Sequence, residues 1–157
     1  MKSLLLVIAL IGGGYYIYNN HSPFQTEVTD PHFIEIRVAV DNTNIKLVGF
    51  GKMFSQEDCL ARSAKIWVNV FKEAGKLNLV DTNCSKTLPG RYEKLFDNKP
   101  IAASYLVFEK GNNRERDGRF IFYGIPSSYV AKECDKLIAR AKKNYRGKVY
   151  CVQGTIG

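Results

Sequence analysis

The chain has 157 residues, a mass of 17.7 kDa and a formal net charge of +8. This length suits one compact domain or two small repeats and excludes a two-domain enzyme with a cofactor fold. With 45% hydrophobic and 24% charged residues, the composition is that of a globular protein and excludes collagen-like, low-complexity and wholly disordered chains.

The first segment, residues 1–20, is predicted to be a membrane anchor. An uncharged apolar run, residues 4–18, follows Met1 and Lys2, and with its flanks it is about 25 Å long as a helix, close to a hydrocarbon core of about 30 Å. The single preceding charge places the N-terminus in the cytoplasm and the body across the inner membrane, in the periplasm or at the cell exterior. A cleaved signal peptide is the alternative, since residues 12–14 are three glycines. No later run is long enough for a second span, which excludes a polytopic membrane protein.

Residues 21–31 are polar, include two prolines and are predicted to be a tether. The first folded unit, residues 32–84, begins with a β-hairpin: residues 33–40 alternate between apolar and polar, a turn cluster follows, and residues 45–50 return as a strand.

A helix is predicted next, because Ser55 and Asp58 resemble a capping box and apolar residues then recur at helical spacing. The apolar positions are Leu60, Ala64, Trp67, Val68 and Phe71. Gly75 ends this helix, and residues 77–84 form the third strand of the unit.

A connector, residues 85–100, leads to a second unit, residues 101–157, with strands at 101–110, 119–123 and 148–153. Its helix is predicted to be capped by Ser127 or Ser128 and to end at Gly147. The apolar stripe of this helix consists of Val130, Cys134, Leu137, Ile138 and Ala141.

The two units share the order strand, strand, helix, strand, with a glycine after each helix. We therefore predict an α+β fold built as an approximate duplication of a ββαβ unit. Its antiparallel-rich sheet, or two packed sheets, would carry both amphipathic helices on one face and follow the N-terminal transmembrane or signal helix.

Each unit also holds two of the four cysteines, which are Cys59, Cys84, Cys134 and Cys151. An even number in an exported chain indicates disulfides, and no CxxC pair supports a zinc site. Three pairings are open, of which the two-unit organisation favours Cys59 with Cys84 and Cys134 with Cys151.

The stretches VGFGKMFSQEDCLARSAKIW, from Val48, and FYGIPSSYVAKECDKLIARAK, from Phe122, each place a strand, a glycine, a serine-containing turn and a helix in succession. This order resembles the repeat half of the sporulation-related (SPOR) peptidoglycan-binding domains. The resemblance implies binding to wall glycan. The extra strand before each unit, the longer helices and the cysteines depart from that family, so no binding residue is transferred from it.

Catalytic constellations are not found in the sequence, so we expect no enzyme, no cofactor and no metal. His21 and His32 lie in or beside the tether, where a solvated histidine is expected. Glu57 and Asp58 stand in the first turn of a predicted helix, where acidic residues complement the helix dipole.

The charge is unevenly distributed. Residues 1–109 hold 12 Lys or Arg against 11 Asp or Glu, whereas residues 110–157 hold 11 against 4. The predicted basic surface of the second unit consists of Arg114, Arg116, Arg119, Lys132, Lys136, Arg140 and Lys143. A basic stripe on a helix is more often an ordinary solvated helix face, but such a face usually mixes signs.

The function expected is that of a non-catalytic, membrane-anchored envelope protein that binds an anionic or protein partner through this surface, as part of a larger assembly. A peptidoglycan-binding module and an inhibitor or immunity-type protein acting outside the cytoplasm are the alternatives. Nucleic acid is a further anionic partner, for which aromatic residues near the basic groups offer stacking. Those aromatic residues are Phe120, Phe122, Tyr123, Tyr129 and Tyr145.

Overall fold

The computed structural model describes residues 27–66 and 77–155. The predicted anchor, residues 4–18, and most of the tether lie outside the described residues. The elements are β1 His32–Val40, β2 Lys46–Met53, α2 Gln56–Ile66, β3 Leu77–Ser85, η3 Gly90–Tyr92, η4 Leu95–Asp97, β4 Tyr105–Glu109, β5 Asp117–Tyr123, α3 Ser127–Ala141 and β6 Lys148–Val152.

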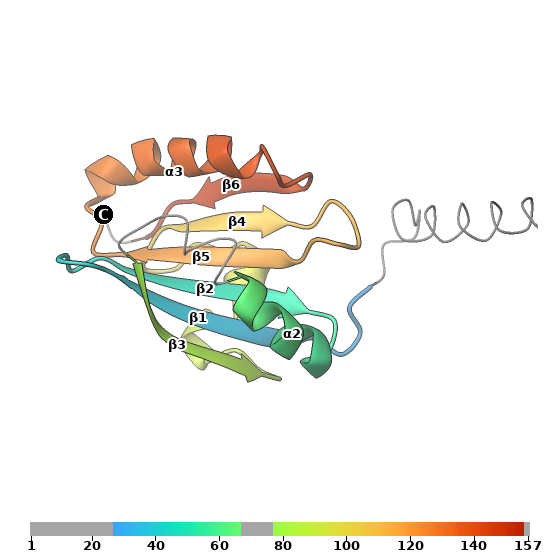
Figure 1. Ribbon diagram of the computed structural model, residues 1–157. Helices are drawn as coiled ribbons and strands as arrows, with labels where there is room; N and C mark the ends of the chain where they lie inside the picture. The colour runs from blue at the N-terminus through green and yellow to red at the C-terminus, as the bar shows by residue number, and fades with distance from the viewer. Residues whose placement is uncertain (1–26, 67–76, 156–157) are drawn as a thin grey trace, which may run out of the picture.

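All six strands belong to one antiparallel sheet with the order β3-β1-β2-β5-β4-β6 (Figure 1). The fold is therefore α+β, as predicted, with one sheet and few helices. In each half the last strand lies outermost, and the halves meet at the central pair of β2 and β5. The predicted hairpin of β1 and β2 is present, and Ile34 lies opposite Gly51 in its register.

Both helices cover the same face of the sheet. Under α2, the alternate residues of β1 (Ile34, Ile36 and Val38) are buried with Met53 and Cys59. Under α3, a second cluster consists of Leu106, Phe122, Val130, Cys134 and Val149. Leu47 and Phe120 pack against both clusters, so the apolar layer is continuous beneath the two helices. A Cβ at Gly49 would lie 2.8 Å from the Phe120 ring, so glycine is needed for this close packing.

The opposite face of the sheet is covered by the connector, which the sequence alone presents only as a link between units. Tyr92 of η3 and Leu95 of η4 are buried there. They pack on a cluster of sheet residues, Val48, Phe50, Tyr105, Val107 and Ile121. The Tyr92 hydroxyl also lies 2.9 Å from the Tyr123 hydroxyl. The connector is thus part of the core.

Each disulfide joins a helix to the outermost strand of its own half. Cys59 of α2 is bonded to Cys84 of β3, and Cys134 of α3 is bonded to Cys151 of β6. These are the pairs that the two-unit organisation favours. Because β3 and β6 each have a sheet neighbour on one side only, the bridges fasten the two edges of the sheet to the helical layer.

The first helix begins as predicted, but Leu60 does not lie on its buried side. The Ser55 hydroxyl accepts a hydrogen bond from the Asp58 backbone N–H at 3.2 Å. Leu60, expected on the apolar stripe, is 60% exposed, whereas its neighbour Cys59 is fully buried. The bridge to β3 turns Cys59 inward and places Leu60 outside. Trp67, Val68, Phe71 and Gly75 lie outside the described residues.

The second helix differs from the prediction at both ends. Its N-cap is Pro126 and no side chain caps it, so neither Ser127 nor Ser128 acts as the cap. It ends at Ala141 rather than at Gly147. Gly147 instead lies just before β6, where a Cβ would overlap the carbonyl oxygen of Glu109. The second unit's first strand, expected from residue 101, begins at Tyr105.

Candidate anion-binding surface

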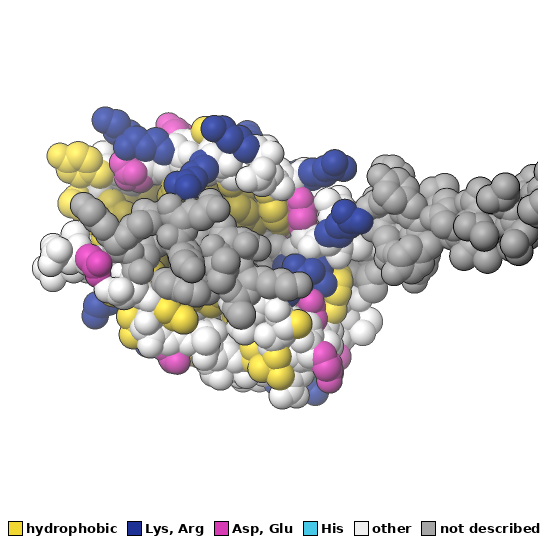
Figure 2. All heavy atoms as spheres, viewed as in Figure 1, with side chains coloured by type: hydrophobic (Ala, Val, Ile, Leu, Met, Phe, Trp, Pro, Cys, Tyr) yellow, Lys and Arg dark blue, Asp and Glu magenta, His cyan; other side chains and the backbone are white. Residues whose placement is uncertain are grey.

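Four of the predicted basic residues are exposed on α3 or in the turn that follows it. Lys132, Lys136 and Arg140 belong to the helix and Lys143 to the turn, and together we call them the α3 face. Helical spacing explains this placement, because Val130 and Cys134 take up the opposite, buried side. Figure 2 shows Lys and Arg side chains gathered over α3, with acidic side chains between them. One ion pair is found on this face, between Lys136 and Glu133 at 2.6 Å.

The three predicted arginines in β5 and in the turn before it do not form one surface. Arg114 is exposed. The Arg116 side chain is only 11% exposed and forms an ion pair with Asp58 at 2.7 Å. Arg119 is 2% exposed and therefore buried. The prediction that Arg116 and Arg119 belong to a binding surface is wrong, because one neutralises an acidic residue of the first unit and the other lies in the core.

Asp58 joins the two units at this point. Its carboxylate accepts hydrogen bonds from the Phe54 backbone N–H at 3.1 Å and from Arg62 Nε and Arg116 Nε, both at 2.7 Å. The Arg116 guanidinium also lies 3.8 Å from the Phe54 ring centroid, a cation–π contact. Burial alone would raise the pKa of Asp58, but the hydrogen bonds, first that from Arg116, lower it to about 2.

Acid is therefore expected to weaken the fold through Asp58. Because the folded pKa is depressed, the stabilisation is fully present above about pH 5 and is lost as the pH falls from about 4 towards 2. Asp58→Asn should lower the free energy of unfolding at neutral pH by about 2 kcal/mol. It should also flatten the pH dependence in the acid range, as measured by denaturant unfolding at a series of pH values. Asp135→Asn, in an exposed position on α3, is the control, and an equal change in both variants would contradict the assignment.

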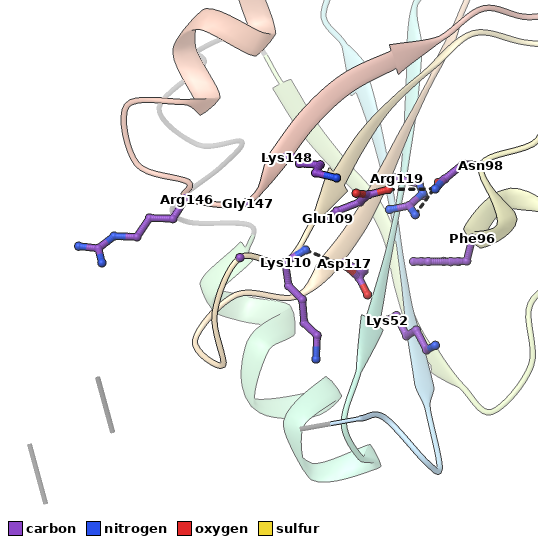
Figure 3. A pocket seen from close by; sticks show the side chains of 11 residues that line it. Lys52, Phe96, Asn98, Glu109, Lys110, Asp117, Arg119, Arg146, Gly147 and Lys148 are labelled. Atoms are coloured by element: carbon purple, nitrogen blue, oxygen red, sulfur yellow. Dashed lines mark hydrogen bonds between the residues drawn. The ribbon is translucent and has the colours of Figure 1, made fainter. Parts of the chain in front are cut away.

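A pocket of about 580 Å³ opens at one end of the sheet, and we call it the sheet-end pocket. Its lining comes from the last residues of β2 and β4, the first residues of β5 and β6, the turns beside them and the η4 segment. The residues are Lys52, Phe96, Asn98, Glu109, Lys110, Gly111, Asp117, Arg119, Arg146, Gly147 and Lys148 (Figure 3). Basic residues outnumber acidic ones, so the pocket favours an anion over a cation.

Arg119 lies in the wall of this pocket as a fixed cation. Its guanidinium donates to the carbonyl oxygens of Leu95 (3.3 Å), Phe108 (2.9 Å) and Gly118 (2.7 Å), and to Asn98 Oδ1 (2.7 Å). Phe96 covers it, with the ring centroid 4.7 Å from the guanidinium carbon. Burial lowers the pKa of Arg119 and Asp117 acts in the opposite direction, but an arginine in this setting stays protonated.

Asn98 connects this cation to an acid. Its side-chain amide donates to Glu109 Oε1 at 3.1 Å, and the Tyr150 hydroxyl donates to the same oxygen at 2.8 Å. Asn98 holds a left-handed backbone conformation, with φ 58°, at the end of η4. The η4 segment therefore places the Asn98 side-chain amide between Arg119 and Glu109. The two charged side chains do not contact each other directly but are each hydrogen-bonded to this uncharged amide.

Sequence reasoning missed Lys52, Arg146 and Lys148, which lie far apart in the chain and meet only at the end of the sheet. The one local signal is the pair of basic residues that flank Gly147 before the last strand. Lys52 belongs to the first unit, so this basic site is not confined to the second unit.

The aromatic residues expected to stack on nucleic acid mostly serve the core. Phe122 is buried, and Phe120 and Tyr145 make edge contacts with Phe108. The Tyr123 hydroxyl is hydrogen-bonded to the Tyr92 hydroxyl. Of the five, Tyr129 alone is largely exposed, so one of these aromatic residues is left for stacking on nucleic acid.

Within the described residues, no group of three His, Cys, Asp or Glu is placed to hold a metal ion. No helix among residues 27–66 and 77–155 is long and apolar enough to cross a membrane. No protein-family model, curated protein or solved structure matches this chain.

Proposed function

We propose that the chain is a non-catalytic, membrane-anchored envelope protein whose α3 face binds an anionic partner. The observation that carries this proposal is the exposure of four basic side chains, three on α3 and Lys143 in the turn after it, with one of them, Lys136, in an ion pair with Glu133. An ordinary solvated helix face mixes positive and negative side chains, whereas this one is dominated by one sign. A surface of that kind attracts acidic proteins and anionic polymers.

The proposed location follows from two features. The apolar run at residues 4–18 supports an inner-membrane anchor with the body in the periplasm or at the cell exterior. The two disulfides are compatible with an oxidising compartment of that kind. Cleavage of the segment, which would release the body, is the alternative.

An approximate duplication of a ββαβ unit accounts for the organisation of the body. Each half has the element order strand, strand, helix, strand, and each places its last strand beside its first and away from the centre of the sheet. Basic residues exceed acidic ones by seven in residues 110–157, which include α3, but by only one in residues 1–109. We infer that the second unit specialised in binding.

The test is capture of the partner with charge-reversed variants. Full-length chain is solubilised from envelopes, and bound material is compared with that of Lys132→Glu, Lys136→Glu, Arg140→Glu and Lys143→Glu combined. We expect loss of the partner with an intact fold, because exposed substitutions change stability by less than about 0.5 kcal/mol each. Binding by the unaltered chain should weaken with salt, since the Debye length is about 8 Å at physiological ionic strength.

The matched control reverses Lys46, Arg91, Lys94 and Lys99, which are also exposed and also three lysines and one arginine. Both sets take the net charge from +8 to zero, so a loss that depends on total charge alone would affect both. Equal binding by both variants would refute the proposal. Recovery of wall glycan would support the peptidoglycan-binding alternative, and recovery of one stoichiometric enzyme would support the inhibitor alternative.

A further inference from the structure

We propose that the basic residues around the sheet-end pocket bind the phosphate groups of anionic phospholipids, so that this end of the body rests on the membrane. The inference depends on the proposed anchoring of residues 4–18 and adds a second, separate basic surface to the α3 face. It rests on where the chain enters the body, on the length of chain before that point and on the charges at the pocket.

The chain enters the body at the same end of the sheet as the pocket. In the register of the sheet, Phe33 near the start of β1 lies opposite Lys52, and Lys52 lies opposite Asp117. On the neighbouring pair, Glu109 lies opposite Lys148. In Figure 1 the segment before β1 joins the body at the right, where the turn between β4 and β5 also lies. An anchor in the N-terminal segment therefore holds this end of the sheet towards the membrane.

The length of the connecting chain limits the distance from the membrane. The residues between Tyr18 and His32 span at most about 50 Å even when fully extended. The body is therefore kept within reach of the headgroups, and the end where the chain enters is the end that meets them first. A weak contact is sufficient under these conditions, because tethering raises the effective concentration of the two surfaces.

Three acidic residues around the pocket, Glu109, Glu115 and Asp117, accept hydrogen bonds that hold the turns. Glu115 accepts hydrogen bonds from the backbone N–H groups of Gly111 and Arg146, both at 2.7 Å. Asp117 accepts one from the Lys110 backbone N–H at 2.8 Å, and Glu109 is occupied by Tyr150 and Asn98. These carboxylates are engaged by groups of the fold, and none of them forms an ion pair within 4.0 Å with Lys52, Arg146 or Lys148.

Three basic side chains at the pocket have no ion-pair partner within 4.0 Å among the described residues: Lys52, Arg146 and Lys148. Figure 3 shows them spread around the rim, with Arg146 directed away from Arg119. Because the cations do not converge on one point, they suit a surface that carries many phosphates better than one small anion. An anionic bilayer is such a surface, and it attracts each nearby Lys or Arg.

The test measures hydrogen exchange of the full chain in nanodiscs. One set contains only zwitterionic phosphatidylcholine, and the other contains added anionic phosphatidylglycerol. We expect the amides of residues 109–117 and 145–149 to exchange several-fold more slowly in the anionic discs, and high salt to remove the difference. The amides of residues 36–40 and 46–49, at the other end of the β1–β2 hairpin, should exchange equally in both sets and so report an intact fold.

The variant Lys52→Gln, Arg146→Gln and Lys148→Gln should lose the slowing. Each residue near an anionic surface changes the binding equilibrium by about fivefold. The control is Lys46→Gln, Arg91→Gln and Lys94→Gln, which removes two lysines and one arginine elsewhere on the body and should keep the slowing. Equal loss in both variants would overturn the site assignment. If the first variant unfolds, the comparison of the two disc types with the unaltered chain still decides the proposal.

Three further outcomes distinguish a wrong ligand, a wrong contact and a wrong anchor. Slowing in zwitterionic discs on addition of glycerol 3-phosphate alone would show a soluble phosphate ligand and overturn the lipid assignment. A chain that stays in the discs but shows no slowing would overturn the headgroup contact and leave the anchor intact. Recovery of the chain outside the discs would overturn the anchor itself, and with it this inference.

Discussion

Removal of both disulfides is expected to lower the free energy of unfolding by about 6 kcal/mol, with about 3 kcal/mol from each bridge. The bridges close loops with sequence separations of 25 and 17 residues, and in the loop-closure model such loops stabilise the fold to a similar degree. A domain of this size is stabilised by about 5–15 kcal/mol in total. The doubly reduced chain should therefore be at or below the limit of stable folding.

The measurement compares urea unfolding of the unaltered chain with the pair variants Cys59→Ala/Cys84→Ala and Cys134→Ala/Cys151→Ala, and with the fourfold variant. The bridges fasten opposite edges of the sheet, so their effects should be close to additive. Addition of a reductant to the unaltered chain should reproduce the fourfold variant. A change below about 1 kcal/mol in the fourfold variant would contradict a structural role for the bridges.

Local patterns were sufficient to predict most elements and the cysteine pairs. The alternation of residues 33–40 and the capping residues Ser55 and Asp58 are short-range signals, and both correspond to what the structure contains. The meeting of β2 with β5 has no such signal, because it depends on Leu47 and Phe120 completing an apolar layer shared by two helices. Pairing between distant strands depends on how the whole sheet packs. The periodicity of a single strand carries no information about that packing.

The connector was missed because its core residues follow neither a period of two nor a helical period. Tyr92 and Leu95 come from two separate 3₁₀ turns, each only three residues long. Such turns are too short to give a periodic pattern. Their burial is recognisable only once the sheet shows an uncovered apolar face that includes Val48, Phe50 and Ile121.

The candidate basic surface shows a similar division. The α3 face follows from helical spacing, so its exposure could be expected from the sequence. Arg116 could not be placed, because its partner Asp58 is 58 residues away. Arg119 did carry a signal: Phe120 and Phe122 point to one side of β5 while Ile121 and Tyr123 point to the other. A strand with apolar residues on both sides is covered on both faces, and an arginine within it is buried.

Arg119→Leu is accordingly expected to lower the free energy of unfolding by about 3 kcal/mol. The guanidinium is the common donor to three backbone carbonyls and to Asn98 Oδ1, and leucine leaves these acceptors buried without it. Loss of the bond to Asn98 should also loosen η4, which sits on the core through Leu95. Denaturant unfolding gives the free energy, and hydrogen exchange at residues 95–98 reports the loosening.

Arg119→Lys separates the charge from the geometry of the hydrogen bonds. A lysine keeps the positive charge, but its single ammonium cannot reproduce a planar fork that donates to several acceptors, so it should restore only part of the stability. Arg114→Leu, in the exposed turn, should change stability by less than about 0.5 kcal/mol. Replacement of buried charges by apolar residues is neutral or stabilising in some proteins. An Arg119→Leu variant as stable as the parent would place this chain among them and would contradict a net stabilising role for the Arg119 hydrogen bonds.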